Sequence, residues 1–420
     1  MRILIHSLNA APEPVGIGKY SGELAAHLAD RGHEVDVLCS PPYYPSWSIE
    51  TAYRGVRWIR EQRDGATYLR APIRIGSRDR IGATARVALE TSFTVSSLRW
   101  WLPILMARSR YDIVYSVCPP LQSALLPTIY RSVRRVPWVL HIQDFQLDAA
   151  LRLGMLPDNV AGRTLYRLES NLLKRATMVT TITESMASRA REKGVDPARV
   201  RVTPNWSDLQ AIRPMRRENP LRTRFNAGQD QTLLLYAGNI GEKQGLEVLM
   251  EAATMLRARE DLVFAVVGEG VSRARLEAEA TRRRLPNLRF FDLVSATELP
   301  TMLAAADVHL VLQRAEAADL VMPSKLTNIM AAGRPTLATA MPGTELHSVL
   351  VSSEAGRVVP PGDAVTLANA IVAMASNPAE RAAQGVAARH YAERALSSET
   401  VLPMIEDLLA EVCQAHPTHA

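Results

Sequence analysis

A glycine-rich segment in the second half of the chain has the residue types that could hold a phosphate group. Gly238-Asn239-Ile240-Gly241-Glu242-Lys243-Gln244-Gly245 follows an apolar run and precedes a helical pattern. Backbone N–H groups at the start of a helix and the ammonium group of Lys243 would together stabilise a leaving diphosphate as its charge develops. The alternative interpretation is a glycine-rich turn with a solvated lysine.

A second segment, Pro323-Ser324-Lys325-Leu326-Thr327-Asn328, combines a capping residue with a cation. Ser324 is predicted to cap a helix whose first turn carries Lys325. A cation at that position is unfavourable for the helix dipole, which favours a role for Lys325 in binding a ligand anion.

Two further glycine loops give weaker signals. Gly16-Ile17-Gly18 follows the first predicted strand, and two glycines there let a phosphate or sugar approach backbone N–H groups. The third glycine of a dinucleotide fingerprint is missing, and a plain strand-to-helix turn explains the segment equally well. Gly268-Glu269-Gly270 is a similar loop after a later strand.

His141 and Asp144 lie at the end of a predicted strand, where either side chain could act as a general base or orient a substrate hydroxyl. A histidine within a strand is also a common core residue with satisfied hydrogen bonds. The chain has no H-E-x-x-H, G-x-S-x-G or Walker lysine motif, which disfavours metal-dependent hydrolysis, esterase chemistry and NTPase function.

The elements that must position these loops alternate between short apolar runs and helical patterns. The predicted strands are 2–7, 34–38, 113–117, 138–142, 178–182, 200–203, 233–239, 262–270, 308–312 and 335–339. Consecutive apolar residues fit parallel strands covered on both faces, so we expect an α/β fold with doubly wound parallel sheets. The carboxyl ends of two such sheets would face a shared cleft.

A polar, proline-containing stretch at 205–231 interrupts the alternation, which indicates a domain boundary. We expect an N-terminal Rossmann-like domain at 1–210, a C-terminal Rossmann-like domain at 211–397, and a helical segment at 398–420 that packs back on the first domain.

Composition excludes several protein classes. A chain of 420 residues with 47% hydrophobic and 22% charged residues is neither disordered nor fibrous. Cys39, Cys118 and Cys413 lie far apart, which favours a reducing compartment, and neither a secretory signal nor a membrane-spanning segment is predicted.

Positive charge is concentrated between residues 51 and 110, which hold 12 arginines and four acidic residues. Trp58, Trp100 and Trp101 lie in the same stretch. Arginines interleaved with aromatic residues suit an anionic lipid surface. A nucleic-acid patch and an ordinary solvated face beside a core helix are the alternatives.

Segments spread over nearly the whole chain resemble the bacterial glycosyltransferases of family 4, in particular enzymes similar to colanic acid biosynthesis fucosyltransferases. The segments are VGIGKYSGELAAHLADRGHEVDVLCSPPYYPSW, HIQD, VTPNWSD, YAGNIGEKQGLEVLMEAA, VVGEG, NLRFFDLVSATELPTMLAAADVHLVL, PSKLTNIMAAGRPTLAT and GRVVPPGD. The resemblance implies the GT-B architecture of two Rossmann-like domains around a cleft. It also implies sugar transfer from a nucleotide donor with retention of anomeric configuration and without a structural metal.

The resemblance assigns roles to individual residues. Gly16 and Gly18 match the family's glycine loop near the donor phosphate and the acceptor, and Lys243 matches the lysine that neutralises the donor diphosphate. Phe291 and Leu293 fall where backbone groups read the nucleobase. Gly238, Gly268 and Ser324 complete the expected donor-binding set.

The chain also departs from the family pattern. Asn239 stands where the family often has arginine, and the usual pair of glutamates aligns with Leu320 and Asn328. Asn328 could bind ribose hydroxyls, while Lys325, Asp319 or Glu316 could substitute at the sugar. The family's His-Asp pair reads Gln143-Asp144, which moves the predicted catalytic role to Asp144 beside Lys243 and Lys325 and leaves His141 and Gln143 near the acceptor.

These observations predict a cytoplasmic enzyme that transfers a sugar from a nucleotide-sugar donor to a lipid-linked or oligosaccharide acceptor in exopolysaccharide synthesis. We expect contact with the anionic inner face of the membrane, and neither a cofactor, a metal nor a nucleic-acid partner. A nucleotide-sugar 2-epimerase of the same architecture is the alternative enzyme. A non-catalytic two-domain sugar-binding protein is the alternative from another class.

Overall fold

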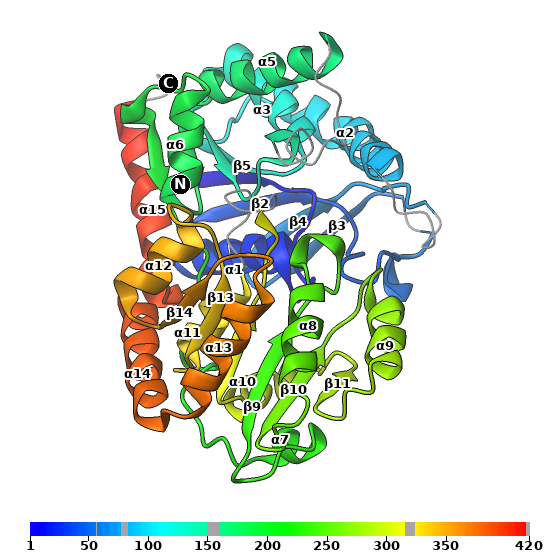
Figure 1. Cartoon of the computed structure of the whole chain (residues 1–420). Coiled ribbons are helices and arrows are strands. Elements are labelled where there is room, and N and C mark those ends of the chain that lie inside the picture. The colour runs from blue at the N-terminus through cyan, green and yellow to red at the C-terminus, as the bar shows by residue number, and fades with distance from the viewer. Residues whose placement is uncertain (56, 77–82, 149–159, 316–323, 417–420) are drawn as a thin grey trace. The chain divides into compact units, whose positions relative to one another are not determined.

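The computed structural model describes residues 1–55, 57–76, 83–148, 160–315 and 324–416. The chain divides into a first unit, Met1–Pro204 with Leu402–Ala420, and a second unit, Asn205–Val401 (Figure 1). The domain boundaries predicted from the sequence are 210/211 and 397/398.

The first unit is built on an eight-stranded sheet in the order β3-β4-β2-β1-β5-β6-β7-β8. All of its neighbouring strands are parallel except β3 and β4. The strands are β1 (Arg2–His6), β2 (Glu34–Cys39), β3 (Ile59–Arg63), β4 (Ala66–Arg70), β5 (Ile113–Cys118), β6 (Trp138–Ile142), β7 (Met178–Thr181) and β8 (Val200–Val202). The helices are α1 (Gly16–Asp30), α2 (Ala83–Met106), α3 (Leu125–Arg134), α5 (Val160–Arg175), α6 (Glu184–Glu192) and the part of α15 (Ser398–Ala415) from Leu402 onward.

The second unit has a six-stranded, fully parallel sheet in the order β11-β10-β9-β12-β13-β14. The strands are β9 (Thr232–Ala237), β10 (Leu262–Val267), β11 (Leu288–Phe291), β12 (Val308–Val311), β13 (Thr336–Thr339) and β14 (Gly356–Val359). The helices are α7 (Pro220–Arg224), α8 (Glu247–Met255), α9 (Arg273–Arg282), α10 (Leu299–Ala305), α11 (Lys325–Ala331), α12 (Glu345–Ser353), α13 (Ala364–Ala375) and α14 (Pro378–Ala395).

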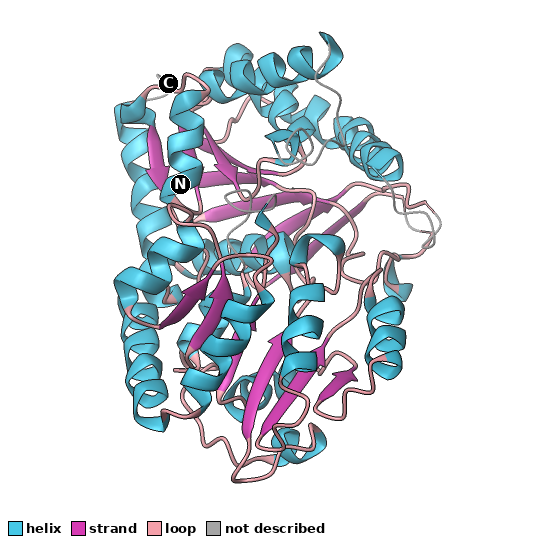
Figure 2. Ribbon diagram, in the orientation of Figure 1, coloured by secondary structure: helices cyan, strands magenta, loops and turns pink. Residues whose placement is uncertain are grey.

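Alternating side chains of the central strands build a separate core on each face of this second sheet. In β9, Leu233 and Leu235 belong to one buried cluster, whereas Leu234 and Tyr236 belong to the other. Side chains alternate because successive Cβ atoms of a strand point to opposite faces. Helices cover both sides of the sheet (Figure 2), so the central strand β10 is apolar and buried along its whole length and β9 nearly so.

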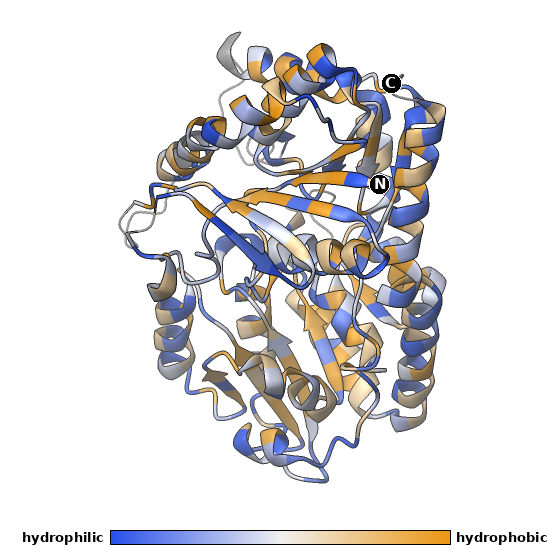
Figure 3. Cartoon of the chain, turned by 180° about the vertical axis from the view of Figure 1, so that it is seen from behind, coloured by the Kyte–Doolittle hydropathy of each residue, from blue (hydrophilic) through white to orange (hydrophobic). Residues whose placement is uncertain are grey.

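The structure confirms the predicted strands but adds four, namely β3, β4, β11 and β14. β3 and β4 form an antiparallel hairpin whose turn is Asp64-Gly65, with both residues at positive φ. Such a pair is a strong hairpin signal. The strand β3 was not predicted because its sequence, Ile-Arg-Glu-Gln-Arg, is mostly charged and polar. Such a sequence suits an edge strand that is partly exposed (Figure 3).

This hairpin and the helix after it use part of the basic stretch at 51–110 inside the first unit. Arg70 is fully buried and donates hydrogen bonds to Glu61, to the Ser40 carbonyl and to the Ala11 carbonyl. The three tryptophans are used inside the unit as well. Trp101 is buried, and the indole N–H groups of Trp58 and Trp100 donate to backbone carbonyls. These side chains therefore have roles in the packing of the unit, and the expectation that the stretch contacts a membrane stays a prediction.

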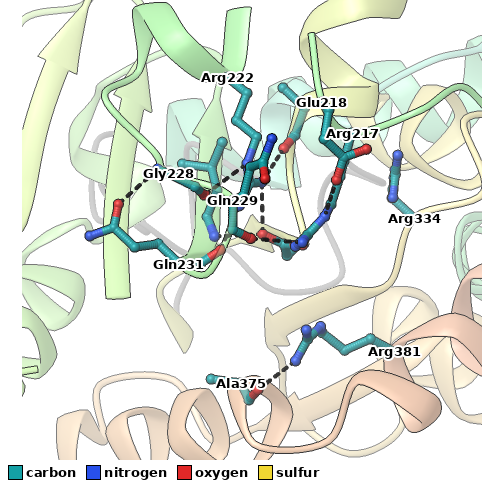
Figure 4. A network of polar contacts seen from close by, with 12 residues as sticks. Arg217, Glu218, Arg222, Gly228, Gln229, Gln231, Arg334, Ala375 and Arg381 are labelled. Carbon is teal, nitrogen blue, oxygen red and sulfur yellow. Dashed lines mark hydrogen bonds and ion pairs between the residues drawn. The ribbon is translucent and has the colours of Figure 1, made fainter. Parts of the chain in front are cut away.

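An arginine network joins the stretch before β9 to the second sheet (Figure 4). Asp307, just before β12, accepts hydrogen bonds from Arg217 at 2.6 Å, from Arg222 at 2.9 Å and from the Leu233 amide at 2.8 Å. Arg222 is buried and also donates to the Gly228, Ala305 and Gln231 carbonyls. The polar stretch after 205 is therefore an integral part of the second unit.

The last helix is held to the first unit by a charged cluster. Glu406 of α15 contacts His27 Nε2 at 3.1 Å, His33 Nε2 at 3.0 Å and Arg31 Nε at 3.3 Å. These partners lie at and just beyond the carboxyl end of α1, so the cluster ties α15 to the connection between α1 and β2.

Candidate functional site

Lys325 opens α11, and its ammonium group is buried beside the loop that follows β9. Its Nζ lies 3.9 Å from the centre of the Tyr236 ring, and a Cβ on Gly238 would lie 3.0 Å from Nζ. Among the described residues Nζ has no hydrogen-bond partner. Burial lowers the pKa of Lys325 to about 7. An incoming anion would supply the counter-charge that this ammonium group lacks.

The glycines of the neighbouring loops are required by close packing of the backbone. Gly238 N donates to the Val267 carbonyl at 2.9 Å and Ile240 N to the Glu269 carbonyl at 2.8 Å, so the loops after β9 and β10 continue the pairing of their strands. A Cβ on Gly268 would lie 1.9 Å from the Gly238 oxygen. The φ values of Gly238 and Gly268, 141° and 155°, also suit only glycine. These loops are therefore rigid before any ligand arrives.

Replacing Gly268 with alanine is expected to destabilise the second unit by about 2–4 kcal/mol, because the methyl group must push the two loops apart. Urea unfolding measures the loss. Gly228→Ala is the matched control, since Gly228 has an ordinary φ and its nearest contact would be 3.4 Å from the new Cβ. Equal stability of the two variants would contradict the close approach.

Lys243 lies in a short 3₁₀ helix, η5 (Glu242–Gln244), with its side chain exposed. Its carbonyl accepts a hydrogen bond from Arg314 N at 3.0 Å, which brings the residues after β12 beside η5. The Arg314 guanidinium is 3.2 Å from Glu247 and 3.6 Å from Glu242. Arg314 is thus another exposed cation at this edge of the sheet, and it was not predicted from the sequence. Its position just after a predicted strand could have indicated it.

The predicted cap at Ser324 is wrong. Its backbone is already helical, with φ −56° and ψ −22°, and its hydroxyl caps no amide. The side chain is exposed, and its carbonyl accepts from the Thr327 hydroxyl. Asn328, one turn into α11, accepts a hydrogen bond from the Ser207 hydroxyl at 2.9 Å, so its amide oxygen holds the helix to residue 207.

Phe291 and Leu293 lie at the end of the edge strand β11. The Phe291 carbonyl accepts from Gly268 N at 3.1 Å, and its ring packs edge-on against Phe225 at 4.9 Å. Leu293 is exposed. An open groove of about 690 Å³ runs between α9 and β11, and Phe291 is the predicted site residue that lines it.

Asn239, between Gly238 and Ile240, is exposed, and its carbonyl accepts the Tyr236 hydroxyl at 2.6 Å. Arg273 fixes the neighbouring loops by ion pairs with Glu269 and Asp292, both at 2.8 Å, and by a bond to the Gly268 carbonyl. Gly238, Asn239, Gly268, Lys243 and Lys325 therefore gather at the carboxyl edge of the second sheet.

In the first unit, a buried carboxylate lies under the glycine loop. Glu13 Oε2 would be 2.4 Å from a Cβ on Gly18, and it accepts from Asn9 Nδ2 at 2.9 Å. Its Oε1 accepts the backbone N–H groups of Tyr43 and Tyr44, each at 3.0 Å. Burial raises the pKa of Glu13 despite these donors. Sequence reasoning missed Glu13, which joins the loops after β1 and β2.

An aromatic cluster stands beside this loop. Trp47 contacts the Tyr43 and Tyr44 rings edge-on, at 5.8 and 5.9 Å between centroids. Tyr44 is exposed, and its ring would lie 3.6 Å from a Cβ on Gly16. Trp47 has a φ of 52°, a conformation that a non-glycine residue keeps only where the surroundings impose it. The cluster is a pre-formed aromatic wall at the carboxyl end of β1 and β2.

His141 is buried, and both of its ring nitrogens are engaged. Gln143 Nε2 lies 2.9 Å from His141 Nε2, and Thr180 Oγ1 lies 2.9 Å from Nδ1. Burial lowers the pKa of His141 to about 3, so the ring is neutral near pH 7. The arrangement matches a core histidine with satisfied hydrogen bonds. Asp144 follows Gln143 at the carboxyl end of β6 with a partly exposed side chain.

The described part of the chain has neither a membrane-spanning helix nor a cluster of metal ligands. No helix there is both long and apolar enough to cross a bilayer. No set of three histidine, cysteine, aspartate or glutamate side chains there is arranged to hold a metal ion. The expectation that no metal is needed stays a prediction.

Comparison with known proteins decides the family. Residues 15–206 match the model of the glycosyl transferase 4-like domain, and residues 218–391 match that of glycosyl transferases group 1. The chain is 39% identical over 413 residues to the putative colanic acid biosynthesis glycosyl transferase WcaI of Escherichia coli K12, covering 96% of this chain and 98% of WcaI. This protein belongs to the glycosyltransferases.

The glycosyltransferase shares its fold with solved structures along almost its whole length. Sucrose-phosphate synthase from Thermosynechococcus elongatus has a TM-score of 0.78 at 18% identity, covering 99% of this chain and 100% of that one. Anabaena HepE in complex with UDP-glucose has a TM-score of 0.72 at 15% identity, covering 98% and 100%. The predicted resemblance and the GT-B fold class are confirmed.

The roles of individual site residues in this glycosyltransferase stay predictions. Glu316, Asp319 and Leu320, which the sequence analysis considered near the donor sugar, lie outside the described residues. Within the second unit the structure brings together the two predicted lysine segments and the glycine loops. Within the first unit, Gly16 and Gly18 lie in the first turn of α1, and His141, Gln143 and Asp144 lie at or just beyond the carboxyl end of β6.

Proposed function

We propose that this glycosyltransferase moves a sugar from a nucleotide-sugar donor to a lipid-linked or oligosaccharide acceptor in exopolysaccharide synthesis, with retention of anomeric configuration. The observation that carries the proposal is the buried ammonium group of Lys325 against Gly238, at the edge of the sheet that also carries Lys243. This ammonium group has no hydrogen-bond partner among the residues that the structure describes. Two cations and a rigid glycine backbone match the chemistry of a diphosphate leaving group.

The donor is a sugar linked to a nucleoside diphosphate, and the second unit takes it. Support comes from the similar fold of HepE, a protein solved with UDP-glucose. In the proposed step the acceptor hydroxyl oxygen attacks the anomeric carbon on the face that the diphosphate leaves. The bond between the anomeric carbon and the phosphate oxygen breaks, and a donor phosphate oxygen takes the hydroxyl proton. Lys325 and Lys243 stabilise the charge that gathers on the diphosphate.

The acceptor binds in the first unit, at the glycine loop, Asp144 and the wall formed by Tyr44 and Trp47. Aromatic faces and a partly exposed carboxylate suit the apolar faces and hydroxyl groups of a saccharide. The similarity to WcaI, whose name refers to colanic acid biosynthesis, supports an exopolysaccharide product. A lipid-linked acceptor would place the enzyme at the cytoplasmic face of a membrane.

Replacing Lys243 with alanine tests the proposed function. We expect the turnover of a UDP- or GDP-sugar with a bacterial lipid-extract acceptor to fall about 10²-fold, because one cation at the developing diphosphate is lost. Urea unfolding should not change, since the side chain is exposed. Lys174→Ala, at an exposed lysine of α5, is the control. Unchanged turnover in the Lys243 variant would remove this lysine from the reaction.

A further inference from the structure

Three neighbouring helices of the first unit carry apolar side chains that are exposed among the described residues. We call this set the apolar helical face. Its residues are Val87, Val95, Leu98, Leu102 and Met106 of α2, Ile129 and Val133 of α3, and Leu165 and Leu168 of α5. Scattered exposed apolar residues are normal on a protein surface, but a contiguous group marks a contact with another phase or molecule.

The spacing of these residues forms stripes along the helices. In α2 the exposed positions 95, 98, 102 and 106 follow the three- and four-residue spacing of one helix face. A separate stripe of the same helix, with Leu89, Phe93 and Trp101, is buried against the unit. α2 is therefore apolar on two faces, and the packing of its own unit explains only one of them.

The three helices lie next to each other. α2 packs against α3, and α3 packs against α5. Figure 1 shows them in succession along one end of the first unit, and the colours of Figure 3 show that these helices contain apolar residues. The stripes are therefore parts of a single surface.

The charges on this surface have one sign. The described parts of α2, α3 and α5 contain two acidic residues, Glu90 and Glu169, and both are buried. Exposed arginines flank the apolar stripes at Arg99, Arg163 and Arg167. An apolar surface flanked by cations and lacking exposed acids complements a bilayer with anionic headgroups.

We propose that the apolar helical face docks on an anionic lipid bilayer, with its aliphatic side chains in the headgroup region and its arginines on lipid phosphates. The inference deepens the proposed function, because it names the surface that brings the enzyme to a lipid-linked acceptor. It differs from the sequence interpretation, since the tryptophans and Arg70 of the 51–110 stretch take no part. A nucleic acid would use the arginines but would leave the aliphatic stripes unexplained.

Vesicle flotation of the full chain tests this surface without donor or acceptor. The vesicles contain about 30% phosphatidylglycerol in phosphatidylcholine, and pure phosphatidylcholine vesicles give the comparison. We expect binding to the anionic vesicles, weaker binding at about 0.5 M salt than at about 0.05 M salt, and weaker binding to the neutral vesicles. The double variant Leu102→Glu with Met106→Glu should bind the anionic vesicles about tenfold less tightly or weaker still.

The matched control also introduces two glutamates, but on the second unit, by Met255→Glu with Val386→Glu. These side chains are 54% and 65% exposed, compared with 52% and 75% for Leu102 and Met106. The control should bind vesicles like the unchanged protein, and all forms should melt alike because the sites are exposed.

Absence of vesicle binding, or equal binding by both double variants, would overturn the proposal. The proposal would also be overturned if the unchanged protein formed a dimer in lipid-free solution and the Leu102/Met106 variant were a monomer, because a second copy of the chain would then cover the face. Nucleoside diphosphate binding, measured in parallel, reports on the donor site alone. If the unchanged protein binds nucleoside diphosphates but does not bind vesicles, the docking surface is refuted and the proposed transfer still stands.

Discussion

Replacing Lys325 with methionine is expected to lower sugar transfer about 10²–10³-fold, because the cation nearest to the Gly238 backbone is lost from the proposed diphosphate site. The same change should leave the second unit as stable as before, or make it more stable. Methionine fills the space against Tyr236 without burying an ammonium group for which the described part of the chain offers no hydrogen-bond partner. A gain in stability together with a loss of activity distinguishes a binding residue from a structural one.

The pKa of Lys325 adds a pH dependence with a defined sign. Burial lowers this pKa to about 7, below its value in the unfolded chain, so the unfolded state binds more protons between about pH 7 and the ordinary lysine pKa. The stability of the unchanged protein should therefore rise with pH in that window. A bound diphosphate would raise the pKa again, so nucleoside diphosphate binding near pH 8 should take up a proton.

Calorimetry of UDP and GDP binding in two buffers of different ionisation enthalpy measures this proton uptake. We expect it in the unchanged protein and in a Lys174→Met control but not in Lys325→Met. If Lys325→Met retained both turnover and proton uptake, Lys325 would have no place in the diphosphate site.

Replacing Asp307 with asparagine is expected to cost about 3–5 kcal/mol of stability in the second unit, because it leaves buried guanidinium charge without its counter-charge. Asp307 holds Arg217 and Arg222 at 2.6 and 2.9 Å, and Arg222 is almost fully buried. Asparagine keeps one oxygen for the Leu233 amide but supplies no charge. The network of Figure 4 joins the stretch after residue 205 to the sheet, so the loss should loosen that stretch as well.

The effect of Asp307→Asn should depend on pH. Burial alone would raise the pKa of Asp307, but the Leu233 amide and the two arginines hold it below its ordinary value. A lowered pKa contributes stability above the unfolded-state pKa of about 4, and this contribution is lost as the pH falls through the folded-state pKa. The difference between variant and unchanged protein should therefore be largest near neutral pH and should shrink in acid.

Urea unfolding at neutral and acidic pH, followed by a probe placed in the second unit, checks both statements. Asp261→Asn is the matched control, because Asp261 pairs with Arg259 at the surface, where such pairs contribute about 0–1 kcal/mol. Equal losses for Asp261→Asn and Asp307→Asn would contradict the role of burial.

The candidate site shows where sequence reasoning succeeds and where it stops. Glycines and lysines in loops after apolar runs can be found by type and spacing, which is how Gly238, Lys243 and Lys325 were predicted. Glu13, Arg314 and the wall of Tyr44 and Trp47 were missed, because each gains its place from a partner distant in sequence. Glu13, for example, is held in place by the hydrogen bonds that its carboxylate accepts from the backbone N–H groups of residues 43 and 44.

The sequence by itself determined the alternation of strands and helices, the presence of two α/β units and the family, because buried parallel strands and helix stripes are periodic patterns within short windows. Only the tertiary structure decided that Lys325 is buried against Tyr236, that Ser324 caps nothing, and that Arg70 and Trp101 face inward. It also showed a hairpin at 59–70 whose charged strand reads as a loop. Burial and pairing depend on groups that are far apart in the chain. These distant groups determine the pKa of Lys325 and the buried position of Arg70 more strongly than the neighbouring residues in the sequence do.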